Sequence, residues 1–360
     1  MNSNLKPGLS GIMRIKNEEQ FIEQCIESCI SALDELIIVY NDCTDNSVAI
    51  IERKQKEYPD KIKIYEYPYK VYGANLTKEE YEYAKSLPDD SPNLLCNYYN
   101  FALSKVTCEY AMKIDADQFY FTPVLTQWAD VCRNPELRKW KPSCIFGSLF
   151  RIYYTLYRRL STSAKKPLTW MIPKWLLSIA YKPYLNYAKW QLSKGKMAIS
   201  LSGLNVFKRD GAWYVTMGRK SSSINVLPPY NGEGDHLIFK MSSNLYYQRF
   251  DMTYYNVLRS SSYSLIEEFV HPFSLAIGGF CWFHLNANRK EFANRLNELF
   301  KTEPNAFTPL AQFLTLPYSS ALQNSSKDVF TLYQRVLFAL PHAVDLKSAE
   351  ENMNILESYD

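Results

Sequence analysis

The sequence predicts an α/β fold built on a mostly parallel central sheet that helices flank. Short runs at residues 9–15, 36–40, 62–67 and 109–114, in which apolar residues predominate, have the length of buried strands, and helical patterns separate them. Strands that alternate with helices require crossover connections, and continuously apolar strands suit a parallel sheet covered on both faces. The chain has 360 residues and is 47% hydrophobic, which allows a large core.

The expected helices lie between these strands. Residues 19–33 carry apolar side chains at helical spacing. Thr44 or Asp45 can cap the next helix, because short polar side chains accept hydrogen bonds from the first free backbone N–H groups. A polar, tyrosine-rich insertion covers residues 68–92, and the pattern then predicts a helix over residues 94–106.

Polar residues follow two of the expected strands where each strand ends. Asn41-Asp-Cys-Thr-Asp45 follows the strand at 36–40, and Asp115-Ala-Asp117 follows the strand at 109–114. In open α/β sheets, ligands bind outside the carboxyl ends of the strands. We therefore expect both clusters to face one crevice, which would be a nucleotide-binding site.

The composition narrows the class of protein. No apolar run reaches the roughly 18 residues that cross a bilayer, and residues 1–8 lack the apolar core of a signal peptide. A cytoplasmic location is therefore expected. The eight cysteines contain no C-x-x-C pair, so the sequence indicates neither a zinc knuckle nor a disulfide framework.

Four sequence elements, in this order, resemble the family 2-like glycosyltransferases of GT-A fold, a bacterial surface-glycan type. Asn17-Glu18 is similar to the Asn-Glu loop after the family's first strand, and Asn41-Asp-Cys-Thr-Asp45 is similar to the Asp-rich turn after its second strand. Tyr99-Asn100 resembles the family's Arg-Asn helix start, and Asp115-Ala-Asp117 resembles its metal-binding D-x-D strand end. The resemblance covers about residues 8–125.

The resemblance implies a GT-A (Rossmann-like) sheet, a nucleotide-sugar donor, here a UDP-sugar, and a divalent cation, Mn²⁺ or Mg²⁺. It also implies transfer with inversion to a glycan or lipid-linked glycan acceptor, in cell-surface polysaccharide or lipooligosaccharide biosynthesis. Tyr40 and Asn41 occupy the positions of the family's paired aspartates, and Asp42 is our choice for the acid that contacts uracil. The expected donor-binding residues are Asn17, Glu18, Asp42, Asn100 and Asp115.

The D-x-D pair suits a divalent cation on chemical grounds. Negative charge grows on the leaving diphosphate as the bond to the sugar breaks, and a cation stabilises that charge as a Lewis acid. Mg²⁺ and Mn²⁺ prefer oxygen ligands, which Asp115 and Asp117 supply. In many enzymes of this fold a late histidine completes the metal shell, which points to His284. Alternatively, the two aspartates cap the turn near Thr122-Pro123, and His284 is a core histidine.

An inverting transferase also needs a carboxylate that takes the proton of the acceptor hydroxyl. The best stretch is Tyr230-Asn-Gly-Glu-Gly-Asp-His236, which is similar to the family's acidic motif at a helix start. We expect Asp235 to be the base, with Glu233 as the second choice. The alternative is that Asp235 caps a helix at residues 237–241 and that Glu233 is a solvated loop charge.

Residues 137–209 form a basic and aromatic segment. It contains 15 Lys or Arg residues, 13 aromatic residues and no acid, whereas the rest of the chain has a net charge of −11. Such a segment favours anionic partners, and we expect peripheral contact with the inner face of the plasma membrane. It could instead stack on acceptor sugars, or form two helices with a basic solvated face. Nucleic acid is not expected, because no nucleic-acid-binding motif accompanies the charge.

The expected domain layout follows these segments. Residues 1–290 form the catalytic domain, with a nucleotide-sugar half at about 8–125 and an acceptor half at about 137–290. Residues 291–360 form a C-terminal helical extension, which includes an amphipathic helix at 329–340. This extension is expected to pack on the catalytic domain or to form contacts in an oligomer.

Two other functions remain open. A sugar nucleotidyltransferase is also an α/β protein with metal-binding aspartates, but the glycine-rich phosphate loop that it needs is missing, since Ser10-Gly11-Ile-Met-Arg14 is poor in glycine. A non-catalytic carbohydrate- or lipid-binding adaptor with a glycosyltransferase fold is compatible with Tyr40 and Asn41. The intact D-x-D pair together with Asp235 speaks against that adaptor.

Overall fold

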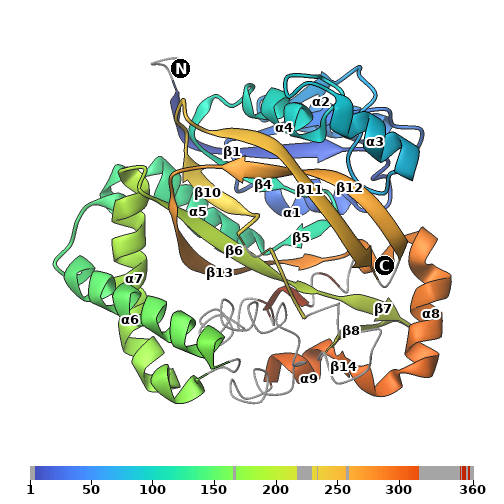
Figure 1. Cartoon of the computed structure of the whole chain (residues 1–360). Coiled ribbons are helices and arrows are strands. Elements are labelled where there is room, and N and C mark those ends of the chain that lie inside the picture. Colours follow the sequence, from blue (N-terminus) through green and yellow to red (C-terminus); the bar gives the residue numbers. More distant parts are fainter. Residues whose placement is uncertain are drawn as a thin grey trace.

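A computed structural model of the chain describes residues 5–164, 168–216, 229–232, 234–256, 259–315, 349, 351–353 and 356. A nine-stranded sheet with the strand order β3-β2-β1-β4-β10-β6-β13-β5 lies at its centre, and β9 pairs with β6 (Figure 1). The strands of this sheet are β1 (Lys6–Ile15), β2 (Glu35–Tyr40), β3 (Ile62–Glu66), β4 (Cys108–Ile114), β5 (Gln118–Tyr120), β6 (Met197–Asn205), β9 (Tyr230–Asn231), β10 (Leu237–Lys240) and β13 (Ser274–His284).

The strand directions bring most carboxyl ends to one edge of the sheet. β3, β2, β1 and β4 pair in parallel. β10 runs antiparallel to both β4 and β6, and β13 is parallel to β6. β1, β2, β3, β4, β6 and β13 therefore all point the same way, which confirms the predicted α/β class with a mostly parallel sheet. We call the edge where these strands end, and where β10 begins, the carboxyl edge.

Helices cover both faces of the sheet. The described helices are α1 (Ile22–Cys29), α2 (Ser47–Glu57), α3 (Lys78–Ser86), α4 (Leu95–Leu103), α5 (Thr122–Arg133), α6 (Ser143–Ser163), α7 (Lys174–Ser193), α8 (Ala293–Thr302) and α9 (Leu310–Thr315). Single 3-10 turns are η1 (Pro135–Arg138), η2 (Thr169–Met171), η3 (Asn286–Asn288), η4 (Lys290–Phe292) and η5 (Pro304–Ala306). Figure 1 shows α6 and α7 as a pair beside the sheet.

Alternation along β4 explains how both faces are filled. Successive side chains of a strand point to opposite faces. Met112 and Ile114 join the hydrophobic cluster that contains residues of α1 and α5, whereas Ala111 joins the cluster that contains residues of α3 and α4. Lys113 therefore lies on the α3 and α4 face, where it is buried. A lysine in this position needs acidic partners, which the carboxyl edge supplies.

Two smaller sheets complete the described structure. β11 (Tyr246–Asn256) and β12 (Arg259–Val270) form an antiparallel hairpin on the α4 side of the main sheet. β7 (Phe207–Arg209), β8 (Ala212–Thr216) and β14 (Phe307–Pro309) form the other. The expected C-terminal helical extension therefore also contributes a strand, β14. The helix expected at residues 329–340 lies outside the described residues.

Several local expectations need correction. The alternative that placed a helix at residues 237–241 is wrong, because these residues contain strand β10, which pairs with β4 on one side and with β6 on the other. The polar insertion at residues 68–92 contains α3, which begins with a capping box formed by Thr77 and Glu80. The idea that Asp115 and Asp117 cap the next helix is wrong, because Phe121 is the N-cap residue of α5.

Glu35 ties β1, β2, β3 and the start of β4 together at the amino ends of these strands. Its buried carboxylate accepts hydrogen bonds from Ser10 Oγ at 2.5 Å and from the backbone N and Oγ1 of Thr107, both at 2.7 Å, and it forms an ion pair with Lys63. Burial opposes the charge, but Lys63, Ser10 and Thr107 outweigh it and lower the pKa of Glu35. The charged form is therefore the one that the fold stabilises.

We expect Glu35→Gln to lower the free energy of unfolding by about 2–4 kcal/mol, because it removes the charge that four donors surround. Since the pKa of Glu35 is lowered on folding, its contribution is present above the ordinary carboxyl pKa and is lost as the pH falls through the folded-state pKa. Urea unfolding between neutral and acidic pH measures both effects. Exposed Glu52 provides the matched control Glu52→Gln, and equal losses in the two variants would contradict this account.

Candidate active site

The carboxyl edge carries acidic, amide, imidazole and guanidinium side chains from six chain segments. They come from the loops after β1, β2 and β4, from the start of β10 and from the end of β13 and the turn that follows it. The residues are Asn17, Glu18, Asp42, Asp115, Asp117, Asp235, His236, His284 and Arg289. We expected the clusters at residues 41–45 and 115–117 to face one crevice. The loops that carry them lie at the same edge of the sheet, because β2, β1 and β4 are adjacent and parallel.

The loops after β1 and β2 are joined by hydrogen bonds. Asn17, with a φ of 58°, accepts a hydrogen bond from the backbone N of Thr44 at 2.7 Å. The backbone N of Glu18 donates to Ser47 Oγ at 2.7 Å. Asp45 accepts from the backbone N of Ser47 at 2.9 Å. Asn17 thus serves to hold the Asp-rich turn in place, and it is exposed beside it.

Asn41 and Asp42 differ sharply in their surroundings. Asn41 is buried, and its Nδ2 donates to the carbonyl oxygens of Tyr67 and Tyr69, both at 2.7 Å. It therefore anchors the chain after β3. Asp42 is exposed, has a φ of 47°, and forms an ion pair with Lys16 at 2.8 Å that lowers its pKa. The acid that we expected to contact uracil thus lies at the rim of the carboxyl edge.

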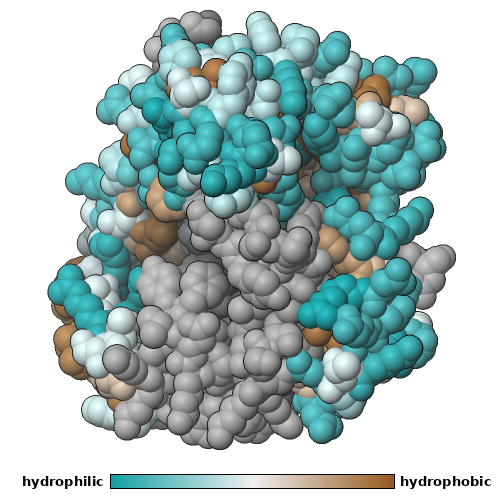
Figure 2. Space-filling model, turned by 45° about the vertical axis from the view of Figure 1, so that its right-hand side comes forward, coloured by the Kyte–Doolittle hydropathy of each residue, from teal (hydrophilic) through white to brown (hydrophobic). Residues whose placement is uncertain are grey.

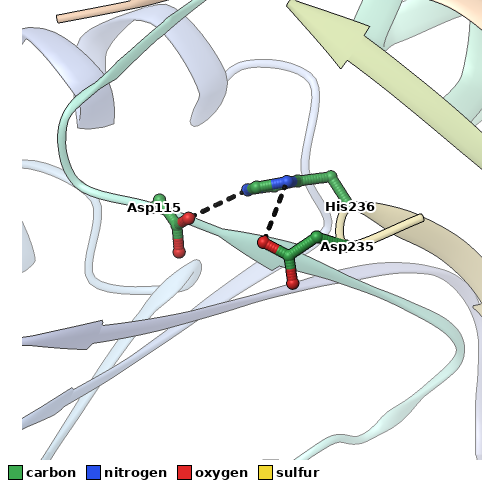
Figure 3. A group of neighbouring side chains, drawn as sticks. All are labelled: Asp115, Asp235 and His236. Carbon is green, nitrogen blue, oxygen red and sulfur yellow. Dashed lines mark hydrogen bonds and ion pairs between the residues drawn. The ribbon is translucent and has the colours of Figure 1, made fainter. Parts of the chain in front are cut away.

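Asp115, Asp235 and His236 form a compact group (Figure 3). His236 Nε2 lies 3.1 Å from Asp115 Oδ2, and His236 Nδ1 lies 3.6 Å from Asp235 Oδ2. One ligand atom from each residue can be chosen such that all three atoms lie within 4.8 Å of one another. β4 supplies the first residue and the start of β10 the other two, because β10 pairs antiparallel with β4.

The imidazole of His236 is buried and firmly positioned. Its ring packs on Trp282, with the two centroids 4.7 Å apart, and its Nε2 also lies 2.9 Å from Gln118 Nε2. Among the described residues, Nδ1 has no hydrogen-bond partner. A buried imidazole nitrogen without a partner, next to two carboxylates, fits the donor set of a divalent cation. The group can therefore hold Mn²⁺ or Mg²⁺ on chemical grounds.

Lys113 balances the charge of this group. Its ammonium lies 2.7 Å from Asp235, 3.5 Å from Asp115 and 4.0 Å from Glu267. Burial opposes the charge of Lys113, but Asp115 and Asp235 outweigh it and raise its pKa well above the ordinary value. Burial alone would raise the pKa values of Asp115 and Asp235, but the charge of Lys113 has the largest opposing effect, and both pKa values are lowered. Both acids are therefore ionised at neutral pH.

Asp117 belongs to a second, neighbouring group. It is buried, with Arg289 Nη2 at 3.1 Å and His284 Nε2 at 3.5 Å. Arg289 also contacts both carboxylate oxygens of Glu18, at 2.9 and 2.7 Å. Burial opposes the charge of Asp117, but His284 and then Arg289 outweigh it and lower its pKa. Burial raises the pKa of Glu18 to about 7 against the opposing charge of Arg289.

The D-x-D pair is thus divided between two groups. Asp115 turns toward Asp235 and His236, whereas Asp117 turns toward His284 and Arg289. Our expected metal set, Asp115, Asp117 and His284, differs from the set that the described residues bring within ligand distance. His284 is held by Asn205, whose Oδ1 lies 2.7 Å from its Nδ1.

One expected residue, Asn100, lies elsewhere. Asn100, within α4, uses its side-chain amide on the backbone of Tyr247, with Nδ2 to O at 2.8 Å and N to Oδ1 at 2.7 Å. It therefore attaches β11 to α4 rather than joining the group around Asp115. Glu233 lies outside the described residues.

Three contributors had no role in the sequence analysis, namely His236, Lys113 and Arg289. His236 follows Asp235 directly, and that adjacency was the available signal. Lys113 lies two residues before Asp115, between the apolar residues Met112 and Ile114 of a strand, and this position could have marked it. Arg289 had no sequence signal, because it reaches Glu18 from 271 residues away.

Comparison with known proteins locates the resemblance in the N-terminal part. Residues 2–134 match the family described as Beta-1,4-N-acetylgalactosaminyltransferase (CgtA). This match confirms the resemblance to glycosyltransferases that the motifs indicated. No curated protein matches the chain.

Solved structures resemble the chain over about one third of its length. A glucosyl-3-phosphoglycerate synthase from Mycobacterium tuberculosis, in complex with Mn²⁺, UDP-glucose and phosphoglyceric acid, is 17% identical, and the match covers 32% of this chain and 35% of that chain with a TM-score of 0.19. The complex of that enzyme with Mg²⁺ and UDP gives the same values. A further mycobacterial protein is 15% identical over 34% of this chain and 38% of that chain, with a TM-score of 0.20. The chain thus spans little more than a third of the solved structures that it matches.

We expect Gly203→Ala to disturb the packing beneath His236. A Cβ atom on Gly203 would lie 2.1 Å from Nε1 of the fully buried Trp282, so the indole would have to move. The free energy of unfolding should fall by about 1–3 kcal/mol, as for other overpacked cores. Urea unfolding followed by tryptophan fluorescence measures this loss.

Gly195→Ala is the control for this test. Gly195 has a φ of +64° and no atom within 4 Å of an added Cβ, so it isolates the backbone cost, which should be about 1 kcal/mol. If Gly203→Ala unfolds no more easily than Gly195→Ala, the close contact with Trp282 does not constrain the site.

Proposed function

We propose that this chain is a metal-dependent glycosyltransferase that moves a sugar from a UDP-sugar onto a glycan or lipid-linked glycan acceptor. The observation that carries the proposal is the meeting of Asp115, Asp235 and His236 at the carboxyl edge of an α/β sheet. The family match over residues 2–134 supports it, because β1, β2 and β4 with their loops lie within that range. The description of that family names transfer of N-acetylgalactosamine, so this sugar belongs among the first donors to test.

Asp115 and His236 are the proposed cation ligands, since they lie 3.1 Å apart and are held by neighbouring side chains, Asp115 by Lys113 and His236 by Trp282. The cation, when bound, supplies Lewis-acid stabilisation of the leaving diphosphate. Asp117 and His284, which were also expected to bind the cation, belong to the neighbouring group, where Arg289 already neutralises charge. We assign them to positioning of the loop after β4.

Asp235 is the proposed base. Its side chain is 53% exposed, so an acceptor hydroxyl can reach it, whereas the side chain of His236 is 2% exposed. Lys113 keeps Asp235 ionised at neutral pH, which is the state required to take a proton. Removal of the hydroxyl proton by Asp235 while the oxygen attacks the sugar from the face opposite the diphosphate gives inversion in one displacement.

The donor is proposed to lie along the loops after β1 and β2. Asn17 and Asp42 are exposed there, and Glu18 lies beneath them against Arg289. We place the catalytic domain at residues 1–290, and in support the main sheet takes its strands from Lys6 to His284. The proposed setting is cell-surface polysaccharide or lipooligosaccharide assembly on the cytoplasmic side, with peripheral membrane contact through residues 137–209.

A non-catalytic adaptor is the second candidate. Two observations favour it, because Asn41 replaces an acid and uses its amide on the backbone, and because Asp235 is paired with Lys113 at 2.7 Å. A protein without turnover would tolerate both features. Nucleotide binding separates this candidate from the enzyme.

Calorimetry should compare the binding of UDP, GDP and CDP with and without Mn²⁺. We expect only UDP to bind, and to bind at least about tenfold more weakly without Mn²⁺, because the phosphates and the carboxylates share the ion. Asp115→Asn and His236→Gln should abolish the Mn²⁺-dependent gain. Asp60→Asn, at an exposed aspartate after α2, is the matched control and should bind as the unmodified chain does. If no nucleotide binds under any condition, the adaptor takes the place of the enzyme.

Asp235→Asn distinguishes a base from a third cation ligand. As a base, Asp235 contributes to turnover, so kcat should fall by roughly 10²–10⁴-fold while Mn²⁺-dependent UDP binding stays nearly unchanged. The assay measures UDP release with a panel of sugar acceptors, alongside calorimetry on the same protein. Loss of Mn²⁺-dependent UDP binding in this variant would show that Asp235 holds the cation, and the base would have to be sought elsewhere.

A further inference from the structure

The helix α6 exposes an apolar stripe. Five aliphatic side chains recur at intervals of three and four residues and lie on one side of the helix. They are Ile145, Leu149, Ile152, Leu156 and Leu160, with exposed fractions of 55, 57, 67, 48 and 41%. We call these five residues the outer stripe. Isolated exposed leucines are ordinary, but a continuous stripe of this length marks a surface that binds something.

The opposite side of α6 is already packed, so the outer stripe cannot turn inward. Cys144, Gly147, Phe150, Tyr154 and Tyr157 are buried on that side. A Cβ atom on Gly147 would lie 2.2 Å from the carbonyl oxygen of Pro183 in α7, so glycine allows the two helices to touch.

The helix α7 fixes this pair to the main sheet. Tyr184 Oη in α7 accepts a hydrogen bond from the backbone N of Ile277 in β13 at 2.9 Å. Asn186 Nδ2 in α7 donates to Ser143 Oγ at the start of α6 at 3.1 Å. The outer stripe is therefore held on the side of α6 that faces away from α7. Figure 2 shows hydrophobic side chains at the lower left edge of the molecule, the side on which Figure 1 places α6 and α7.

Exposed cations and tryptophans lie in the same segment of the chain as the outer stripe. Residues 137–209 contain no acid, and Arg159, Lys174 and Lys182 are exposed on α6 and α7. Three exposed tryptophans belong to the same segment, Trp140, Trp170 and Trp175. Exposed aliphatic side chains together with cations and tryptophans are the composition of surfaces that insert into the head-group region of a bilayer. No helix among the described residues is long and apolar enough to cross one.

The charge decides between a bilayer and a second copy of this chain. A symmetric dimer through the outer stripe would place two acid-free basic segments against each other, because a two-fold contact brings the same patch of both copies together. An anionic bilayer offers apolar contact and opposite charge at once, and attraction to it grows with every lysine or arginine near its surface.

We propose that the outer stripe of α6, with the exposed cations of α6 and α7, docks this protein on the surface of an anionic lipid bilayer. The bound state places the axis of α6 in the interface, with the aliphatic side chains among the acyl chains and Arg159 at the phosphates. This names the surface behind the membrane contact suggested above, and it depends on α6 and α7 rather than on the proposed reaction.

Vesicle flotation of the full chain tests this docking. Binding to vesicles of phosphatidylcholine and phosphatidylglycerol in equal amounts should exceed binding to phosphatidylcholine alone by at least about tenfold, and added salt should weaken it. Ile152→Ser combined with Leu156→Ser should reduce binding to the anionic vesicles by at least about tenfold. Arg159→Glu should reduce it by a similar factor. Tyr83→Ser, at a tyrosine of α3 that is 51% exposed, is the control and should bind normally.

Two results would overturn the docking proposal. One is equal flotation of the unmodified chain and of the double variant Ile152→Ser with Leu156→Ser, the stripe variant. The other is absence of flotation together with a dimer, seen by sedimentation velocity, that the stripe variant converts to a monomer, since the stripe would then join two copies. Calorimetry of UDP and Mn²⁺ on the same variants, without lipid, keeps the two proposals apart. Failure to bind nucleotide would not affect the flotation result. Failure to float with vesicles would likewise not affect nucleotide binding.

Discussion

The buried ammonium group of Lys113 is the interaction on which the carboxyl edge depends. Three carboxylates, those of Asp115, Asp235 and Glu267, lie within 4.0 Å of it. Without a cation there, these acids would repel one another in a partly enclosed place, and proton uptake would relieve the repulsion. Lys113 lets Asp115 and Asp235 remain charged beside His236. Charged carboxylates are what both a divalent cation and an acceptor hydroxyl require.

A second cation, Arg289, forms ion pairs with Asp117 and Glu18. The two strand-end aspartates thus have separate partners although one residue lies between them. Trp282 packs against His236 in the group of Asp115, Asp235 and His236. Gly203 makes this packing possible, because only a residue without a side chain leaves room for the indole. The site therefore rests on rigid strands on one side and on short loops on the other, an arrangement that fixes the acids while leaving access to solvent.

The chain also separates its charges in space. The acids that serve the proposed chemistry lie at the carboxyl edge, whereas the acid-free segment forms α6 and α7, which Figure 1 shows as a pair beside the sheet. Attraction to an anionic surface and attraction of a metal cation require opposite local potentials. Placing them on different elements allows both in one protein.

The sequence by itself determined the α/β class, the succession of β1 to β4 along the chain and the presence of Asp115 and Asp117 at a strand end, because these follow from local patterns of apolar and polar residues. Tertiary structure decided the rest. The apolar run at residues 237–239 is too short to show a period. Pairing with β4 and β6 made residues 237–240 a strand and brought Asp235 and His236 to Asp115. Folding also brought Arg289 to Glu18, which is 271 residues away in the sequence. It placed the buried Lys113 beside Asp235 as well. Such contacts arise from strand pairing and packing over long separations, for which a single sequence carries no local signal.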